Sequence, residues 1–329
     1  MSILKIPISL IIDDPAPVIS VYKEHAEKSV TQDGRPLVST YPNELLFRFC
    51  DVVEKHGIKG KFSVVPMPGN KGDIVHGIKG IPQAEVDRWL DTVKARVAPR
   101  FSICPEILSH HKAVDLKTGK PLEVSEKVWA TTQDRSTLTP YITLALSLLQ
   151  QAGFSPSGVT SPWNFGITVE DEYVAAISQA VYNVTGKNEA WYFLRSLRNR
   201  KNAKPWVAYD TADRVVVSIP STVSDYLWYT IDTTDTSNAF VESLADKWIT
   251  ADGSDGEIIR TIEGGGYPIL ITHWQSLMSN NLGTGIRVLD EVGTRVNKLL
   301  GERVEWMSFE QIMNIVLANK AAYPKPCFD

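Results

Sequence analysis

Short apolar runs alternate with longer segments of helical period along the whole chain. The runs are rich in Ile and Val and read as strands, and the nearly continuous apolar run over residues 6–12 fits a strand buried on both faces. The predicted strands are residues 6–12, 61–65, 100–104, 158–161, 190–194, 206–209, 215–219, 268–272 and 304–306. The predicted helices are residues 43–56, 83–97, 140–151, 170–183, 237–249, 284–300 and 308–319.

This alternation predicts parallel βαβ units and excludes a β-sandwich or a helical bundle. About seven strands in one unbroken series favour an α/β fold with a single distorted (β/α) barrel. We expect one domain over residues 1–329, with long loops at about 111–139 and 185–205. The glycines at 264–266 precede a strand rather than a helix, so they are not a dinucleotide-binding fingerprint.

Polar side chains follow three of the predicted strands at the point where each strand ends. Asp13 and Asp14 close the first strand, His110 and His111 follow the third, and His273 closes a late one. Because the carboxyl ends of parallel barrel strands meet at one mouth, we expect these groups to share a site there.

The adjacent carboxylates of Asp13 and Asp14 repel each other unless a cation or a proton separates them. This pair therefore suggests one carboxylate on a metal and the other acting as a base. The alternative is a simple turn, because Pro15 follows directly.

Neutral imidazole is the commonest nitrogen ligand of divalent transition metals. His110 and His111 are consecutive and face opposite ways on an extended chain, so one of the two is expected to reach the mouth. Surface histidines on a loop are the alternative. For His273 the alternative is a satisfied core histidine.

Tryptophans also follow strand ends. Trp163 and Trp274 are candidates for walls that stack against a sugar ring, and Glu106 is a further candidate for contact with the substrate. Core or lid packing is the alternative for both indoles, because tryptophan content alone does not decide the class of ligand.

Composition narrows the classes of function. The net charge is −4, and only residues 195–204 are densely basic, so nucleic-acid binding is not expected. The three cysteines are too few and too scattered for a disulfide framework or a cysteine-rich zinc site. No apolar stretch is long enough for a membrane span, and the N-terminus lacks a secretory signal, so a cytoplasmic protein is expected. The oligomeric state is not indicated.

Several of these segments together resemble the polysaccharide deacetylase family. Residues 8–14 (ISLIIDD) look like its first motif, an apolar strand followed by Phe-Asp-Asp-Gly. Residues 57–65 (GIKGKFSVV) are similar to its second strand, and residues 161–163 (SPW) echo its Arg-x-Pro-(Trp/Tyr) motif. Residues 271–273 (ITH) resemble its late Leu-x-His motif. The segments occur in the family's order and span most of the chain.

The resemblance implies a distorted seven-stranded (β/α) barrel and roles for individual residues. Asp13 would be the general base, Asp14 a metal ligand, and His273 the general acid. One histidine of His110 and His111 would be a second ligand of the metal. The implied cofactor is a divalent metal, zinc first, with cobalt or nickel as alternatives. The implied reaction is hydrolysis of an N- or O-acyl group on a carbohydrate or related small molecule.

The sequence also departs from the family pattern. The family's second motif has two histidines four residues apart, whereas Val114 and Asp115 follow the histidine pair here. Pro15 replaces a glycine, and Thr160 or Ser161 stands where the family has an arginine that holds the base. Divergence in substrate, metal or activity is therefore open.

Two other functions fit a barrel of this kind. A glycoside hydrolase would need two carboxyl groups facing each other across the mouth, and Asp13 and Glu106 are the candidate pair. A carbohydrate-binding barrel without catalytic activity is the second. Bound metal separates the deacetylase from both.

Overall fold

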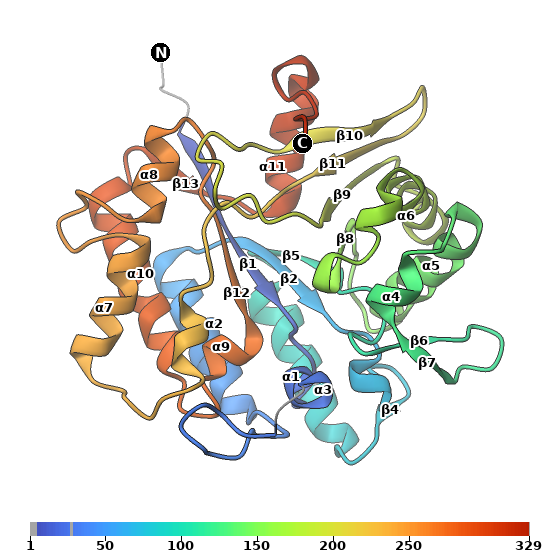
Figure 1. The fold of residues 1–329 in the computed structure, drawn as a ribbon, viewed down its shortest axis with the longest axis horizontal. Helices are drawn as coiled ribbons and strands as arrows, with labels where there is room; N and C mark the ends of the chain where they lie inside the picture. Colours follow the sequence, from blue (N-terminus) through green and yellow to red (C-terminus); the bar gives the residue numbers. More distant parts are fainter. Residues whose placement is uncertain (1–4, 27–28, 329) are drawn as a thin grey trace.

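A computed structural model describes residues 5–26 and 29–328 of the chain (Figure 1). Its strands are β1 (Ile6–Asp13), β2 (Gly60–Val64), β3 (Gly72–Asp73), β4 (Gly77–Ile78), β5 (Phe101–Pro105), β6 (Lys112–Val114), β7 (Pro121–Ser125), β8 (Gly158–Thr160), β9 (Glu189–Phe193), β10 (Trp206–Asp210), β11 (Val215–Ser218), β12 (Ile269–His273) and β13 (Val304–Trp306). Its helices are α1 (Val21–His25), α2 (Asn43–His56), α3 (Gln83–Thr92), α4 (Glu126–Ala130), α5 (Arg135–Gln151), α6 (Glu170–Thr185), α7 (Asn238–Trp248), α8 (Glu257–Glu263), α9 (Trp274–Met278), α10 (Thr284–Leu300) and α11 (Phe309–Ala318).

Seven parallel strands form the centre of the molecule. One sheet has the order β12-β1-β2-β5, and a second contains β8, β9 and β11. Single parallel bridges join the two sheets at both ends, Glu106 with Thr160 and Val223 with Leu270. The circuit closes through these bridges rather than through full ladders, which confirms the predicted distorted (β/α) barrel. The antiparallel β10 extends β11 outside this circuit, and β13 pairs with the start of β1.

Alternate residues of β1 point into two different cores, as the period of two in a strand requires. Ile8, Leu10 and Ile12 join the large cluster that the outer helices cover. Ile11 faces inward and packs in a separate cluster that includes Trp191. The helix α11 contributes to this inner cluster at the end where β1 begins (Figure 1). The opposite end, where the parallel strands finish, is left for the site.

Most predicted elements are confirmed, including the helix over 43–56 and its left-handed C-cap at Gly57 (φ 65°). The region 111–139 is not the long loop that we expected. It holds the hairpin β6–β7, the short helix α4 and the start of α5. The helix α5 begins at Arg135 because Asp134 and Thr137 form a capping box, so Pro140 lies inside the helix rather than at its start.

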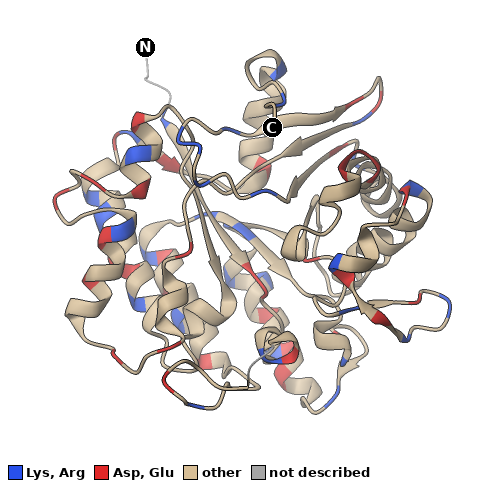
Figure 2. Ribbon diagram, viewed as in Figure 1, with Lys and Arg blue, Asp and Glu red and all other residues tan. Residues whose placement is uncertain are grey.

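The predicted helix over 83–97 ends at Thr92 and continues as a π-helical turn over Val93–Val97. Lys and Arg positions are mixed with Asp and Glu over most of the ribbon (Figure 2), consistent with the small net charge. The cysteines are all free. Among the described residues, no helix is long and apolar enough to cross a membrane.

Candidate metal centre

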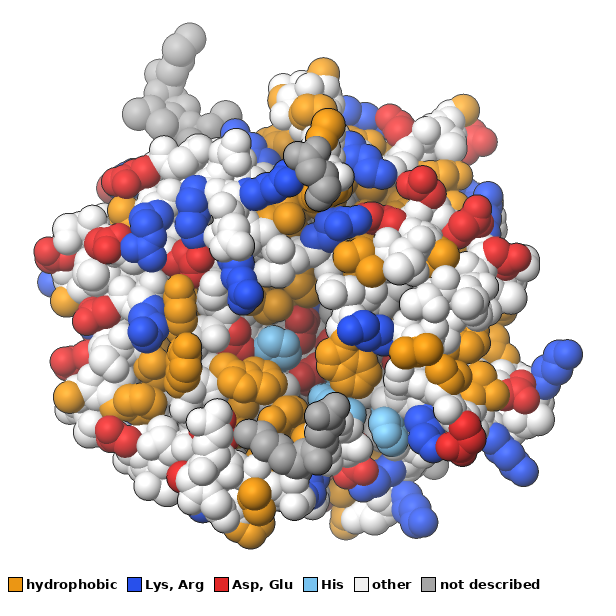
Figure 3. Space-filling view, viewed as in Figure 1, with side chains coloured by type: hydrophobic (Ala, Val, Ile, Leu, Met, Phe, Trp, Pro, Cys, Tyr) orange, Lys and Arg blue, Asp and Glu red, His pale blue; other side chains and the backbone are white. Residues whose placement is uncertain are grey.

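A pocket of about 370 Å³ opens at the carboxyl ends of the barrel strands. Figure 3 shows it as a hollow in which histidine and acidic side chains are visible between large hydrophobic ones. Its lining includes Asp13, Asp14, Glu106, His110 and His273. Four of these five are groups that we predicted from strand ends, and the barrel brings them together because parallel strands finish on one side.

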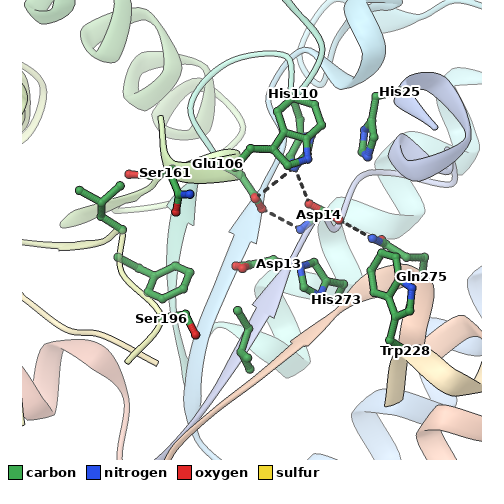
Figure 4. Close-up of a pocket in the computed structure, with 15 residues that line it drawn as sticks. Asp13, Asp14, His25, Glu106, His110, Ser161, Ser196, Trp228, His273 and Gln275 are labelled. Carbon is green, nitrogen blue, oxygen red and sulfur yellow. Dashed lines mark hydrogen bonds and ion pairs between the residues drawn. The ribbon is translucent and has the colours of Figure 1, made fainter. Parts of the chain in front are cut away.

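Three donor groups converge on the floor of the pocket. Atoms of Asp14, Glu106 and His110 lie within 4.8 Å of one another, and all three residues are buried. His110 Nε2 lies 2.8 Å from Asp14 Oδ1 and 3.4 Å from Glu106 Oε1 (Figure 4). Two carboxylates and one imidazole are donors that suit a divalent metal.

The outer oxygen of each carboxylate is held by the protein. Gln275 Nε2 donates to Asp14 Oδ2 at 2.6 Å. Glu106 Oε2 accepts the backbone N–H of Asp14 at 2.7 Å and lies 2.9 Å from Ser63 Oγ. The inner oxygens are thereby aimed at His110 Nε2. Partners of this kind, which orient the ligands, are typical of metal sites.

The charge balance of the cluster also fits a cation. Burial and the negative charges of Asp13 and Asp14 raise the pKa of Glu106 to about 7. Burial alone would raise the pKa of Asp14, but His110 holds it well below its usual range. Asp14 Oδ1 is buried and accepts no well-aligned hydrogen bond from the described residues. A divalent cation would relieve this repulsion and use this oxygen, so the donor set fits a metal.

The backbone around the cluster is strained. Asp14 (φ 68°), His110 (φ 52°), Trp163 (φ 45°) and Asn164 (φ 67°) line the pocket, and all four have left-handed conformations that favour glycine. Each costs on the order of 1–3 kcal/mol and persists only where the surroundings enforce it. Strained residues of this kind cluster at functional sites, which makes this pocket the candidate.

Glu126 enforces the turn that carries His110. This carboxylate at the start of α4 is fully buried and accepts the backbone N–H groups of Ser109 (2.9 Å) and His110 (2.8 Å). Tyr141 donates its hydroxyl to the same carboxylate at 2.7 Å. Burial raises the pKa of Glu126 in spite of these donors. The turn is therefore fixed from the side of α4 and α5.

Asp13 forms a buried ion pair with Lys61 of β2. Lys61 Nζ also donates to Thr160 Oγ1 (2.7 Å) and Ser63 Oγ (3.0 Å), and it lies 4.7 Å from the centre of the Phe193 ring. Both charges are almost fully buried, so each depends on the other for compensation. Lys61 thus holds Asp13 from β2, whereas the family's arginine would stand at position 160 or 161, where this chain has Thr160 and Ser161.

His273 is oriented by Asp225. Its Nδ1 donates to Asp225 Oδ2 at 2.8 Å, which leaves Nε2 for the pocket. Burial lowers the pKa of His273, but the hydrogen bond to Asp225 and the charges of Asp14, Asp225 and Asp13 together raise it to about 9. The imidazole is therefore protonated at neutral pH and can donate a proton.

Aromatic rings enclose the other side of His110. The His25 ring stacks on it with the centroids 4.6 Å apart, and Trp163 meets it edge-on at 4.1 Å. Burial and the charge of His110 lower the pKa of His25 to about 3, so this ring is neutral. Trp163 lines the pocket where we predicted a wall, and Trp228 packs edge-on against His273 at 5.2 Å.

Two predicted residues lie elsewhere. Trp274 is buried in the core and packs edge-on against Phe49 and Phe62, with centroids 5.6 and 5.5 Å apart. It follows His273 and points to the opposite side of the strand, so it does not border the substrate. His111 also lies outside the pocket, and of the two consecutive histidines only His110 joins the cluster. They follow one another in a bend, where His110 has a left-handed backbone, and not on the extended chain that we expected.

Sequence reasoning missed the part that Glu106 plays. We expected it to touch substrate or to act as a glycosidase carboxylate, whereas it is the third donor of the cluster. The signal was present: Glu106 and His110 are four residues apart, the spacing of the family's two histidines. The spacing is met upstream of His110, at Glu106, and not downstream, where Val114 and Asp115 stand. Lys61, Gln275 and Asp225 had no signal in their local sequence.

No known family profile matches the sequence, and no curated protein matches it. Solved structures do match. A protein assigned as a polysaccharide deacetylase from Mycobacterium smegmatis superposes with a TM-score of 0.57 at 14% identity, over 99% of this chain and 95% of that one. A 4-α-glucanotransferase from Thermococcus litoralis gives 0.46 at 12% identity, over 94% and 40%. A peptidoglycan N-acetylglucosamine deacetylase gives 0.44 at 12% identity, over 94% and 88%. The first of these superpositions shows that the chain has the fold of the polysaccharide deacetylases, as its motifs predict.

Proposed function

We propose that the protein is a metal-dependent hydrolase that removes an acyl group from the nitrogen or oxygen of a carbohydrate or related small molecule. The observation that carries this proposal is the convergence of Asp14, Glu106 and His110 beside a held carboxylate, Asp13, and a protonated imidazole, His273. All five groups line one pocket (Figure 4).

Asp14, Glu106 and His110 would hold the metal. A divalent cation there would supply Lewis-acid polarisation of the acyl carbonyl and of a water molecule. Zinc is our first expectation, with cobalt or nickel as alternatives. The carboxylate-rich donor set also suits manganese, so a test must include it.

Asp13 would be the general base. Its Oδ1 is occupied by Lys61 and lies 3.1 Å from Ser63 Oγ. Its Oδ2 accepts no hydrogen bond from any described residue, and Asp13 lines the pocket. A carboxylate held at one oxygen and free at the other can take a proton from water in a fixed direction.

His273 would be the general acid. Because Nδ1 is bound to Asp225, the proton on Nε2 is the one available to the departing amine or alkoxide. Asp13 and His273 are register partners on neighbouring strands β1 and β12, so the base and the acid keep a fixed separation. A carboxylate and an imidazole that face one pocket supply the base and the acid for the two proton transfers of acyl hydrolysis.

The arrangement favours this reaction over glycoside hydrolysis. Ser63 Oγ lies 3.1 Å from Asp13 Oδ1 and 2.9 Å from Glu106 Oε2, so both carboxyl groups adjoin one buried hydroxyl. A glycosidic bond would have to sit between the two carboxyl groups, where this hydroxyl lies. Glu106 is also committed to the backbone N–H of Asp14.

Acetate release tests the proposal. The protein, loaded separately with zinc, cobalt, nickel or manganese, is incubated with N-acetylated and O-acetylated oligosaccharides. We expect the wild-type protein to release acetate from at least one of these classes. In Asp13→Asn the rate of release should fall at least about a hundredfold, as for removal of a general base. The matched control is Asp91→Asn, an exposed carboxylate on α3. Full activity of Asp13→Asn, or equal losses in both variants, would refute the assignment of Asp13.

A further inference from the structure

The basic segment 195–204 lies directly beside the pocket. Blue positions follow one another along the loop that leaves β9 (Figure 2), and Ser196 of this loop pairs with Ser221. Ser196 and Asn164 line both the pocket and a second hollow of about 520 Å³. The rest of that hollow is formed by Ile167 and residues 195 and 197–200, which include three arginines. A molecule in the pocket can therefore extend into the hollow past Ser196.

The three arginines have one acidic partner among the described residues. Arg195 pairs with Glu170, and its Nε is buried without a hydrogen bond from the described part of the chain. Arg200 donates to the backbone oxygen of Cys327 at 2.9 Å. Arg198 is exposed, and its side chain makes no ion pair with any described residue.

Phe328 holds two of these cations close together. The guanidinium carbons of Arg195 and Arg200 lie 4.2 and 5.5 Å from the centre of the same ring. The ring stabilises each cation through its face but brings no negative charge. Glu170 offsets the charge of Arg195, so the three guanidinium groups together keep an excess of positive charge, which a bound anion would balance.

An oxyanion is the ligand that this arrangement suits. Arginine presents several N–H donors in a planar fork that matches a carboxylate or a phosphate with two parallel hydrogen bonds. Arg198 and Arg200 are exposed, so an anion can reach them directly from solvent and needs no buried path. Because the hollow shares Ser196 and Asn164 with the pocket, a single molecule could place an acyl group in the pocket and an anionic group in the hollow.

We propose that the hollow lined by Arg195, Arg198 and Arg200 binds an oxyanion of the substrate, so that the enzyme acts on an acidic acyl sugar. That the bound molecule is a substrate rests on the proposed hydrolase function, but binding of the anion can be tested separately. The anion is a carboxylate or a phosphate, and the two sources are separated by the choice of sugar.

The test compares three sugars of similar size: N-acetylglucosamine, which is neutral, N-acetylmuramic acid, which carries a carboxylate, and N-acetylglucosamine 6-phosphate. Binding is measured by calorimetry on the metal-loaded protein and turnover by acetate release. We expect at least one acidic sugar to bind at least about tenfold more tightly than the neutral one. The acidic sugar with the larger gain in affinity over the neutral sugar identifies the anion. This gain in affinity should decrease in high salt, because exposed charges are screened.

Variants locate the effect. In Arg198→Gln combined with Arg200→Gln, the ratio of acidic to neutral affinity should fall towards one. Arg195 is left unchanged because it also pairs with Glu170. The matched control is Arg303→Gln, an exposed arginine directly before β13, where the parallel strands begin rather than end. This control should keep the wild-type ratio.

Two results would overturn the inference: equal binding of neutral and acidic sugars by the wild-type protein, or an acidic preference that the double variant retains. If no sugar is hydrolysed but acidic sugars still bind in an arginine-dependent way, the anion site stands and the hydrolase proposal fails. If acetate is released equally from all three sugars, the hydrolase stands and the anion site fails.

Discussion

The buried side chain of Lys61 holds the proposed base, Asp13, through an ion pair. Lys61 is fully buried, and Asp13 is the one carboxylate among the described residues that forms an ion pair with it. Removal of either partner leaves the other charge uncompensated in the interior, which is far more costly than loss of a surface pair. The pair therefore links the stability of the barrel to the position of its base.

Lys61→Met should lower the free energy of unfolding by about 3–5 kcal/mol, the range for breaking a buried pair. Combining it with Asp13→Asn should recover part of this loss, because neither charge then remains unpaired. Urea unfolding of the two single variants and the double variant measures the coupling. The control Lys79→Met, at an exposed position, should change stability by less than about 0.5 kcal/mol. Additive losses without coupling would contradict this account.

The second single-residue prediction concerns pH. The pKa of His273 is raised to about 9, so its acidic form is present below that pH and is lost as the pH rises through it. A cation on Asp14 would offset part of the negative charge that raises this pKa, so acyl hydrolysis by the metal-loaded protein should fall on the alkaline side at or below pH 9. Asp225→Asn removes the charge that supports the imidazolium and should shift this limb to lower pH. A pH–rate profile that Asp225→Asn leaves unmoved would show that His273 is not the acid.

Short elements, rather than the long helices, shape the site. The helix α4 has only five residues, yet its Glu126 receives two backbone N–H groups of the turn that carries His110. Neither this helix nor the hairpin β6–β7 has a long periodic pattern, which is why we expected a loop there. The long elements were predictable because α2 and α10 each keep a wide apolar face over several turns.

Glu126→Gln should loosen the turn that carries His110. The amide keeps one acceptor but turns an N–H₂ group towards backbone donors, so one buried N–H loses its partner, at about 1–3 kcal/mol. Metal affinity should fall by about 10–100-fold, as for other groups that orient ligands. Competition with a chromogenic chelator measures that affinity. Glu123→Gln, an exposed residue of β7, is the control. An unchanged metal affinity in Glu126→Gln would show that Glu126 of α4 does not help to position the metal ligand His110.

The whole barrel explains which parts of the site could be predicted from the sequence. Asp13, Asp14 and His273 follow apolar runs, and the barrel gathers strand ends, so their meeting could be predicted. The ion pair between Lys61 and Asp13 could not be predicted. A lysine within β2 looks like an ordinary polar position in the sequence, and only the folded barrel shows that it points inward. The role of Glu106 was hidden by its chemistry, since a carboxylate stands where the family pattern has an imidazole.

The central claim is that Asp14, Glu106 and His110 bind one divalent metal. Elemental analysis of protein purified without chelators or a metal-affinity tag, and incubated with excess metal, tests it most directly. We predict about one equivalent in the wild-type protein and in His111→Asn, and almost none in Asp14→Ala, Glu106→Gln or His110→Asn. No metal in the wild-type protein, or full occupancy of the His110→Asn variant, would contradict the account.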